Sequence, residues 1–497
     1  MRGAEAAVLL VFVPLVAAGL AVALPRRARA WAVLGALLAQ PLLLLVLSAE
    51  TLSQGPRQLV LAGQAVPLGI RLYVDGLALL MLWLVAAVGG VAGVHALASH
   101  PPASAAGGRF WPLWLLMTAG LQALFLSGDL FNVYVAIELL TLCAIALVAA
   151  EGEPGALRAA MRYLLLGMLA SLAYLLGVAL LYGEHGTLDL AALAAPVAAA
   201  GRRGVTLPAL ALISVGLLLK AAVFPLHVWL PPAHAQAPGA VSAVLSALVV
   251  KTGIYMLYRL WLWTGEGLQR DAVLALLGTL GAAAVLFGSA AALVQDQLKR
   301  VVAYSTVAQL GYLMLAFPLL GAAAASPAWA GAGLQLAAHG VAKAAMFLAA
   351  AALVHGLGSG RLERLAGADR TLPLGVFAFG LAGVSLMGLP PSGGFLAKWL
   401  LLQAAWGQGA WAIVAVLLAG SLMAAGYVFR VLAAAFARDE GGPPAAVRPV
   451  PLAMTLPALL LGVCAVAMGF AAAPLLRLLG VAPPGGEGAV AGLEVLP

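Results

Sequence analysis

Long uncharged stretches recur from one end of this chain to the other, separated by short segments that carry most of the charge. A helix needs about 18 or more mainly apolar residues to cross a hydrocarbon core about 30 Å thick. The stretches of that length cover residues 7–24, 31–48, 72–98, 110–127, 129–150, 157–182, 208–230, 237–262, 271–294, 301–320, 327–356, 373–402, 409–436 and 450–477. The pattern predicts about 14 transmembrane helices.

These spans are expected to be helices, because backbone polar groups cannot stay unpaired in lipid and no period-two alternation indicates a barrel. The composition agrees, since 64% of the residues are hydrophobic and 9% are charged, against about one quarter charged in a soluble domain. Neither the longest connection, about 183–207, nor the Gly- and Pro-rich tail after Leu478 has room for a separate fold. We therefore expect an all-α polytopic membrane protein with a single transmembrane domain over residues 1–497.

The arginines indicate an orientation. All 21 fall at or near span ends, and the basic residues other than four lysines deep in the spans split 14 to 8 between the two sides. Cytoplasmic loops carry the excess of Lys and Arg, so the richer side is expected in the cytoplasm and both termini outside the inner (plasma) membrane. The richer side has Arg26, Arg27, Arg29, Arg109, Arg158, Arg162, Lys299, Arg300, Arg361, Arg364, Arg370, Arg430, Arg438 and Arg448, and the other has Arg2, Arg57, Arg71, Arg202, Arg203, Arg259, Arg270 and Arg477.

The net charge of +8 is then mostly a topology signal, and no nucleic-acid partner is expected. Arg2 is the only charge ahead of the first apolar run except Glu5, and no clear cleavage site follows. We therefore expect that run to be a retained helix rather than a signal peptide.

Four of the five lysines, Lys220, Lys251, Lys343 and Lys398, lie inside apolar stretches. Burial favours the neutral amine of a lysine, and ionisable residues at membrane depth mark proton or ion paths. The alternative is that each lysine extends along its helix to the interface. The first three lie about eight or more residues from a predicted span end, which disfavours this alternative, and Lys398 is less well separated because its helix is interrupted.

Glu138 is the one acidic residue near the middle of a predicted span. A carboxylate at that depth needs a cation or a proton, and Lys220 is the candidate partner; a purely structural ion pair is the alternative. His339 and Lys343 are four residues apart and share one helix face, where a proton can pass between them through water. His339 has the alternative of a structural hydrogen-bond network. His227 and His234 flank a WLPP segment, at a proton entrance or in an interfacial structural role.

Both halves of the chain have a proline break near a lysine. Pro225 follows Lys220 by five residues, and Pro390 and Pro391 precede Lys398 in a segment rich in glycine. Paired interrupted helices are typical of inverted-repeat transporters. We expect three N-terminal helices over about 1–108, a first five-helix repeat over 109–265, a second over 266–440, and a last helix and tail over 441–497.

The chain lacks the motifs of cofactor chemistry. Cys143 and Cys464 stand alone, without the spacing of a disulfide framework, a zinc site or an iron–sulfur cluster. No GxGxxG fingerprint or GxxxxGK[ST] loop is present. We expect no cofactor, no metal and no redox or hydrolytic site in this chain.

Six stretches in order resemble one family. They are VDGLALLM at 74–81, GDLFNVYVAIELL at 128–140, KAAVFPLHVWLPPAHAQAP at 220–238, LKRVVAYSTVAQLGY at 298–312, HGVAKAAMFL at 339–348 and GLPPSGGFLAKW at 388–399. The sequence resembles the antiporter-like subunits of the complex I membrane arm and of Mrp cation/proton antiporters. It is most similar to the D-type subunit of Mrp antiporters or the N-type subunit of complex I. M-type members usually have glutamate at Lys398, and L-type and Mrp A-type members extend beyond the fourteenth helix.

The resemblance implies fourteen helices with two inverted five-helix repeats, each with a broken helix, and a hydrated polar axis along the membrane plane. It implies that Glu138 modulates the proton affinity of Lys220, that Lys251 is the central connecting group and that His339 and Lys343 continue the path. It further implies that Lys398 serves the second half-channel. Gln335 stands where L-type members often have histidine, which leaves the route through this helix open.

The sequence therefore favours a proton-translocating membrane subunit of a multi-subunit cation/proton antiporter or complex I-like assembly. The expected partners are other integral membrane subunits, the lipid bilayer, protons, and Na⁺ or another exchanged cation. The parent assembly would be an antiporter or an NADH-quinone oxidoreductase-like or hydrogenase-like translocase. Two alternatives stay open. One is a self-contained secondary transporter of a small anionic solute, and the other is a structural membrane subunit of a redox or carbon-acquisition complex.

Overall fold

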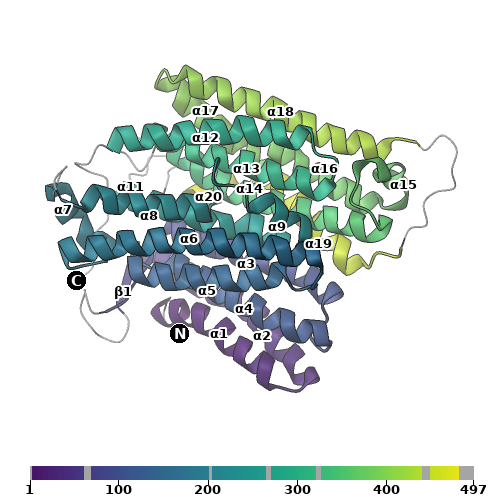
Figure 1. Ribbon diagram of the computed structural model, residues 1–497, viewed down its shortest axis with the longest axis horizontal. Helices are drawn as coiled ribbons and strands as arrows, with labels where there is room; N and C mark the ends of the chain where they lie inside the picture. Colours follow the sequence, from purple (N-terminus) through teal and green to yellow (C-terminus); the bar gives the residue numbers. More distant parts are fainter. Residues whose placement is uncertain are drawn as a thin grey trace.

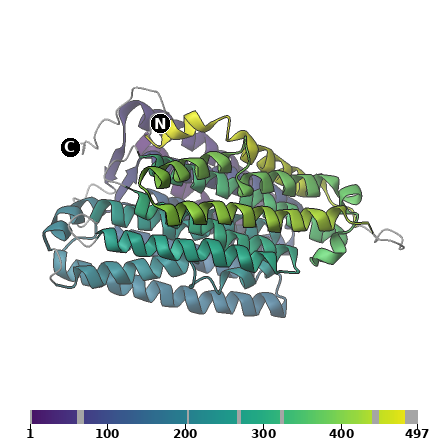
Figure 2. The same cartoon turned by 90° about the horizontal axis from the view of Figure 1, so that it is seen from above.

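The protein is a bundle of helices. The structure, a computed structural model, describes residues 3–60, 69–200, 204–264, 270–320, 326–438 and 448–480. In Figures 1 and 2, two views at right angles, the long helices lie alongside one another. The first half comprises α1 (Gly3–Ala23), α2 (Arg26–Gln54), β1 (Arg57–Val60), β2 (Arg71–Val74), α3 (Gly76–Ser99), α4 (Ala105–Leu126), α5 (Leu130–Val148), α6 (Pro154–His185), α7 (Leu190–Ala200), α8 (Thr206–Lys220), α9 (Leu230–Gln236), α10 (Gly239–Val244), the π-helical turn η2 (Leu245–Val249) and α11 (Val250–Thr264).

The second half has a similar succession of elements. It comprises α12 (Arg270–Leu293), α13 (Leu298–Leu315), η3 (Phe317–Leu319), α14 (Pro327–Leu357), η4 (Leu362–Leu365), α15 (Ala368–Thr371), α16 (Pro373–Met387), α17 (Gly393–Gly407), α18 (Trp411–Phe436), α19 (Leu452–Ala467) and α20 (Ala472–Leu478). The expected all-α polytopic fold is confirmed.

Ten helices of the described chain are long and apolar enough to cross a membrane, and the bent pair α19–α20 brings the number to 11. Each expected span coincides with one helix or with consecutive helices. Three fall outside the 11: the stretch 110–127 is α4, and the stretches 208–230 and 373–402 are interrupted, at α8–α9 and α16–α17. The expected breaks are therefore present, and the count of 14 stays a prediction.

The helices that carry Lys251 and Lys343 lie at the centre. In α10–η2–α11 the whole of the most apolar 18-residue window is buried inside the protein, and in α14 89% of it is, against 33% in α18 and 39% in α6. The peripheral helices α1, α2, α6 and α18 expose many large apolar side chains. Lys251 and Lys343 are thus surrounded by protein, while the outer helices present a surface suited to lipid or to other membrane subunits.

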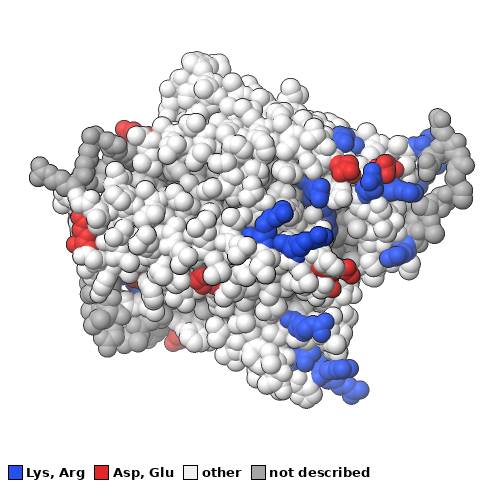
Figure 3. All heavy atoms as spheres, viewed as in Figure 1, with Lys and Arg blue, Asp and Glu red and all other residues white. Residues whose placement is uncertain are grey.

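The connections at each end of the bundle are tied together. At one end the strands β1 and β2 form an antiparallel hairpin, Leu72 bridges to Ser127 and Asp129 bridges to Asp189. At the opposite end Gln297 bridges to Arg361, and the basic residues gather there. Figure 3 shows Lys and Arg side chains concentrated toward the end where α15 lies, beside a broad surface with almost no charge.

Three elements were not expected from the sequence. Strand β1 lies between two predicted spans, and β2 overlaps the first three residues of the predicted span 72–98, where no strand was predicted. Helix α7 lies within the predicted connection 183–207 and packs against α11. Its sequence, LAALAAPVAAA, is apolar, and the helix packs Leu190, Leu193 and Val197 against the bundle instead of forming an exposed loop.

Helix α11 crosses α8 at a glycine. A Cβ atom built on Gly253 would lie 2.4 Å from the Leu217 carbonyl oxygen and 3.0 Å from the Ala221 Cβ atom. Such close backbone approach is what small residues permit in membrane helices. The crossing lies one turn from Lys220 and two residues from Lys251, so it sets the spacing of the helices that carry these lysines.

Replacing Gly253 with alanine should destabilise the protein, because the added carbon would overlap the Leu217 carbonyl group. Overpacking of this kind typically costs about 1–3 kcal/mol. Thermal denaturation of the purified protein should therefore show a lower midpoint for Gly253→Ala. The matched control is Gly183→Ala in α6, where the added carbon would meet nothing within 4 Å. Equal midpoints for the two variants would contradict the packing argument.

Candidate functional site

Glu138, in the middle of α5, is the partner of the Lys220 ammonium group. Lys220 Nζ donates to Glu138 Oε1 at 3.1 Å and to the Thr141 hydroxyl at 2.9 Å. The Ser171 hydroxyl of α6 donates to the same carboxylate oxygen. The side chain of Lys220 is 7% exposed and that of Glu138 is 27% exposed. The structure thus brings together the two residues that the sequence pairs, with the carboxylate toward the edge of the bundle.

Lys220 is the last residue of α8, directly before the first helix break. In the break Ala222 has a φ of 52°, and no other described non-glycine residue has a positive φ. This backbone conformation is strained for a residue with a Cβ atom. The break also frees carbonyls at the end of α8, and Trp229 Nε1 donates to the Leu219 carbonyl at 2.9 Å. Lys220 therefore lies at a helix C-terminus, where the helix dipole favours a cation.

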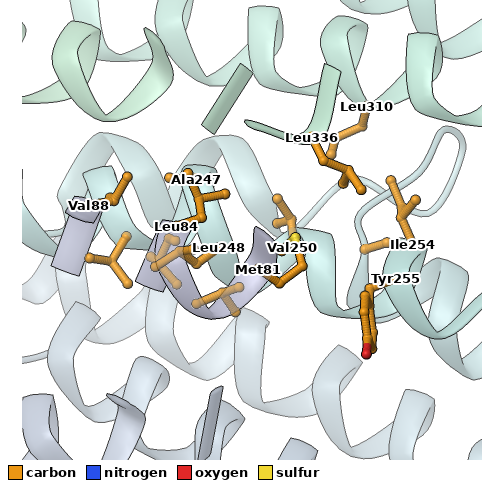
Figure 4. Close-up of a cluster of buried hydrophobic side chains, with 14 of the residues drawn as sticks. Met81, Leu84, Val88, Ala247, Leu248, Val250, Ile254, Tyr255, Leu310 and Leu336 are labelled. Atoms are coloured by element: carbon orange, nitrogen blue, oxygen red, sulfur yellow. The ribbon is translucent and has the colours of Figure 1, made fainter. Parts of the chain in front are cut away.

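Lys251 follows the π-helical turn η2 and is fully buried. Its ammonium group folds back onto that turn and donates to the carbonyls of Ala247 at 2.6 Å and Ser246 at 3.3 Å. Other side chains of the η2–α11 segment lie in apolar surroundings. Figure 4 shows Leu248 and Val250 in a cluster with Met81, Leu84 and Val88 of α3. Apolar side chains therefore close the α3 side of this helix to water.

Lys343 and His339 lie one turn apart in α14. Lys343 Nζ donates to the Val302 carbonyl of α13 at 2.7 Å and to the Ser305 hydroxyl. His339 is 2% exposed, and neither of its ring nitrogens has a hydrogen-bond partner in the described chain. Lys251, Lys343 and Lys398 all interact electrostatically with this ring. A buried imidazole normally has a hydrogen-bond partner, so the surroundings of His339 do not by themselves decide between a structural role and a role in proton transfer.

Lys398 lies in the second turn of α17, after the second break. Its ammonium group reaches back across the break to the carbonyls of Leu386 at 2.7 Å and Met387 at 3.4 Å. It also donates to the Ser421 hydroxyl at 3.3 Å and lies 4.4 Å from the centroid of the Tyr312 ring. The carbonyls belong to the last turn of α16, so here too a broken helix supplies acceptors to a lysine.

Two glutamines connect α14 with the second break. Gln335 Nε2 donates to Gln309 Oε1 at 3.0 Å, and Gln309 Nε2 donates to the Leu386 carbonyl at 3.2 Å. The Leu386 carbonyl also accepts from Lys398. Gln335 therefore belongs to the same polar contact as the lysine, through an amide that can orient groups but cannot carry a charge.

The six residues selected from the sequence form two groups in space. Glu138 and Lys220 are in direct contact, and in the other group His339 and Lys343 share α14, while Lys251 and Lys398 lie on α11 and α17. No hydrogen bond between described side chains joins Lys220 to Lys251, although their helices cross at Gly253.

Two further histidines lie near the first break. His227 is within the break and contacts the rings of Phe224 and Phe287. His234 is fully buried and stacks on Phe347 of α14 with ring centroids 4.4 Å apart, and its ring nitrogens have no partner in the described chain. Lys343 and Lys299 both interact electrostatically with His234. His234 thus lies inside the bundle rather than at its interface.

Asp75 and Arg259 form an ion pair that the sequence pattern does not predict. Asp75 accepts from the Ala78 amide at 2.9 Å and so caps α3. Its carboxylate also accepts from Arg259 Nη1 at 2.6 Å and Nη2 at 2.5 Å. The guanidinium group lies over the rings of Tyr73, Tyr255 and Trp263. Arg259 is therefore a buried contact between α11 and the start of α3.

Most of the neutral partners of the ionisable groups were not found from the sequence. They are Thr141, Ser171, Ser246, Ala247, Val302, Ser305, Tyr312, Leu386, Met387 and Ser421. Thr141 had a usable signal, because it lies three residues after Glu138 and therefore shares its helix face. Most of the others lie on different helices from the group they contact, so spacing along the chain could not reveal them.

Comparison with known proteins gives one consistent result. Residues 127–424 match the family described as NADH:quinone oxidoreductase/Mrp antiporter, TM. The N subunit of the NADH-quinone oxidoreductase of Desulforudis audaxviator is 38% identical over 438 residues, which cover 85% of this chain and 86% of that protein. The D subunit of the Na⁺/H⁺ antiporter of Alkalihalophilus pseudofirmus is 29% identical over 90% of this chain and 89% of its own.

Among solved structures, a chain of the Mrp complex from Dietzia sp. superposes with a TM-score of 0.86 at 28% identity and covers 96% of each chain. The family match spans both helix breaks, and all six residues selected from the sequence lie within it. The chain therefore belongs to the family of membrane subunits shared by NADH:quinone oxidoreductases and Mrp antiporters.

Proposed function

We propose that this chain is a proton-translocating subunit of a multi-subunit cation/proton antiporter or complex I-like assembly in the plasma membrane. The observation that carries the proposal is the Glu138–Lys220 pair at a helix break inside a membrane bundle. Related chains are named as subunits of an NADH-quinone oxidoreductase and of a Na⁺/H⁺ antiporter. The charged groups extend over several helices instead of converging on one pocket, which favours a proton relay over a binding site for an anionic solute.

The pair Glu138–Lys220 acts as the first station. A buried ammonium group is stabilised by the adjacent carboxylate, so the lysine holds its proton while Glu138 is charged and near. When Glu138 is protonated or moves away, the remaining neutral partner Thr141 cannot offset the cost of burying the charge. Lys220 then releases its proton. The strained backbone at Ala222 lies two residues from the lysine and offers a point where the break can change conformation.

Lys251, Lys343, His339 and Lys398 form the later stations. His339 lies one turn from Lys343 in α14, and an imidazole can take up a proton at one ring nitrogen and release one from the other. Lys398 binds carbonyls at the second break, the counterpart of Lys220 in the second half. The order of helices supports two repeats over 109–265 and 266–440, each with three helices, a broken helix and a further helix.

We also propose an orientation, with the basic end of the bundle in the cytoplasm and both termini outside. The basic residues of segments 26–29 and 361–370 lie at that end. Gly3, at the start of the described chain, contacts Glu50 near the end of α2. Leu478, near the end of the described chain, lies against Gly76 at the start of α3. Both ends of the described chain therefore lie at the end of the bundle that has the β1–β2 hairpin. Lys299, which binds the Ala237 carbonyl at 2.8 Å, and His234 lead from the cytoplasmic end toward Lys343.

Other integral membrane subunits complete the assembly. The peripheral helices expose large apolar side chains, among them Phe12, Leu38, Leu169 and Leu422. Glu138 is more than a quarter exposed on a helix that also exposes Phe131, Val135 and Leu142. A carboxylate in contact with lipid is unfavourable, so the α5 surface is better explained by protein contact.

Lys220→Ala and Glu138→Gln should each reduce coupled proton transport to about one tenth or less, because the first station can no longer hold and release a proton. The assembled complex, measured in vesicles with a pH-sensitive dye, gives the rate, and co-purification of the partner subunits checks assembly. Glu363→Gln, which removes a carboxylate from an exposed pair with Arg361, is the control and should keep the wild-type rate. Full transport by Lys220→Ala would refute the mechanism.

His339→Gln should lower transport while the complex still assembles, because glutamine keeps polarity but cannot take up a proton. The expected loss is about tenfold across roughly pH 6 to 8. His355→Gln is the matched control, since His355 is an exposed histidine in the last turn of the same helix. Wild-type rates for His339→Gln at every pH would remove this residue from the path.

The orientation is tested by labelling single cysteines in a variant with Cys143 and Cys464 replaced. An impermeant maleimide added to intact cells should label Ser53→Cys, at the exposed end of α2, and should not label Ala103→Cys, in the connection between α3 and α4. After the membrane is opened, Ala103→Cys should react as well. The reverse pattern would place both termini in the cytoplasm.

A further inference from the structure

Two hydroxyl groups connect the helix of Lys251 with the helix that receives Lys343. Ser246 Oγ of η2 and Thr306 Oγ1 of α13 lie 2.9 Å apart, and both residues are fully buried. Neither residue was selected from the sequence, and the two are 60 positions apart. We call Ser246 and Thr306 the hydroxyl bridge.

Both lysines contact the ends of this bridge. On one side, Lys251 Nζ donates to the carbonyl of Ser246 itself at 3.3 Å. On the other side, the Val302 carbonyl accepts from Thr306 Oγ1 at 3.0 Å and from Lys343 Nζ at 2.7 Å. The two lysines also interact electrostatically with each other. Two like charges in a buried site repel, so the favoured state has one ammonium group and one neutral amine.

We propose that the hydroxyl bridge carries a proton between Lys251 and Lys343, an inference that rests on the proton-translocating function proposed above. A hydroxyl group can accept a proton while it donates its own, which a backbone carbonyl cannot do. The Lys251 ammonium group swings from the Ala247 carbonyl to Ser246 Oγ and gives it a proton. Ser246 passes its own proton to Thr306, and Thr306 turns from the Val302 carbonyl to donate to the neutral Lys343 amine. One ammonium group becomes an amine and the other amine becomes an ammonium group, so charge and atoms balance.

The surroundings of Lys251 favour proton transfer toward α13 over transfer toward α3. The α3 side of η2 and α11 is closed by Met81, Leu84 and Val88 of α3, which belong to the apolar cluster of Figure 4. The hydroxyl bridge has polar surroundings on α13, because the hydroxyl of Ser305, the residue before Thr306, accepts a hydrogen bond from Lys343 Nζ. The carbonyls of the π-helical turn hold the Lys251 ammonium group in the resting arrangement, so transfer requires it to leave them.

Removal of either hydroxyl tests the bridge. Ser246→Ala and Thr306→Val should each slow proton transport by about tenfold, and the double variant should be no slower than the single ones because both act in one step. Thr306→Ser, which keeps the hydroxyl, should restore transport to near the wild-type rate. Rates are measured on the assembled complex in vesicles and divided by the amount of assembled complex, so that a loss of assembly does not count as a loss of transport.

A solvent isotope effect separates a relay from a structural contact. Transport measured in D₂O should slow more in Thr306→Val than in wild type, because proton transfer becomes the slow step. The matched control is Thr252→Val, whose hydroxyl lies beside Lys251 but donates to the Val249 carbonyl of its own helix at 2.7 Å. It should keep both the rate and the isotope effect of the wild type.

The outcomes also separate this inference from the proposed function. If Lys220→Ala is inactive while the Ser246→Ala/Thr306→Val double variant transports at the wild-type rate, the bridge is wrong and the function stands. Slowing by Ser246→Ala and Thr306→Val equal to that of Thr252→Val, with an unchanged isotope effect, would also overturn the bridge and make the contact structural. Full transport by Lys220→Ala would overturn the proposed function.

Discussion

A buried ammonium group must have its water replaced by other acceptors, and the polar interior of this protein follows from that requirement. Removing an ion from water costs several kcal/mol unless close partners compensate. Lys220 finds a carboxylate and a hydroxyl, while Lys251, Lys343 and Lys398 find backbone carbonyls. Carbonyls in a regular helix are already paired, so lysines need places where the helix departs from regularity. Three of the four lysines lie at such places: a helix end, a π-helical turn and a second break.

In the proposed relay, irregular helices and mobile protons are thus two results of one arrangement. A carbonyl group carries no net charge, so it stabilises an ammonium group less strongly than a carboxylate does. A lysine held only by carbonyls therefore loses its proton more readily than one paired with a carboxylate. The carboxylate of Glu138 differs, because its charge strongly favours the protonated lysine. In the relay proposed above, the first station therefore depends on the state of one acid, while the later stations depend on one another. Placement of the acid at the edge of the bundle lets neighbouring subunits influence it.

Much of this arrangement could be predicted from the sequence, and the reason is physical. Charged residues inside apolar runs stand out, a lone carboxylate requires a partner, and prolines in such runs can break helices, as at Pro225 and Pro390, although Pro14 and Pro41 lie inside continuous helices. These rules lead to Glu138, Lys220 and both breaks. They do not lead to Ser246, Thr306 or Gln309, because serine, threonine and glutamine are common in helices and their partners lie on distant segments. The ion pair of Arg259 with Asp75 was not predicted for a related reason, since a residue near a span end can face either solvent or a buried carboxylate.

The crossing of α8 and α11 at Gly253 has a mechanical consequence. Where a side chain separates two helices, its rotamers can absorb a small displacement of one before the other responds. Here the backbone of α11 lies directly against the Leu217 carbonyl, one turn before Lys220. If α8 shifts when the first helix break rearranges, α11 must therefore shift with it, because no side chain between the two backbones can absorb the movement. The first lysine and the central lysine can then move as linked parts even though no hydrogen bond between described side chains joins them.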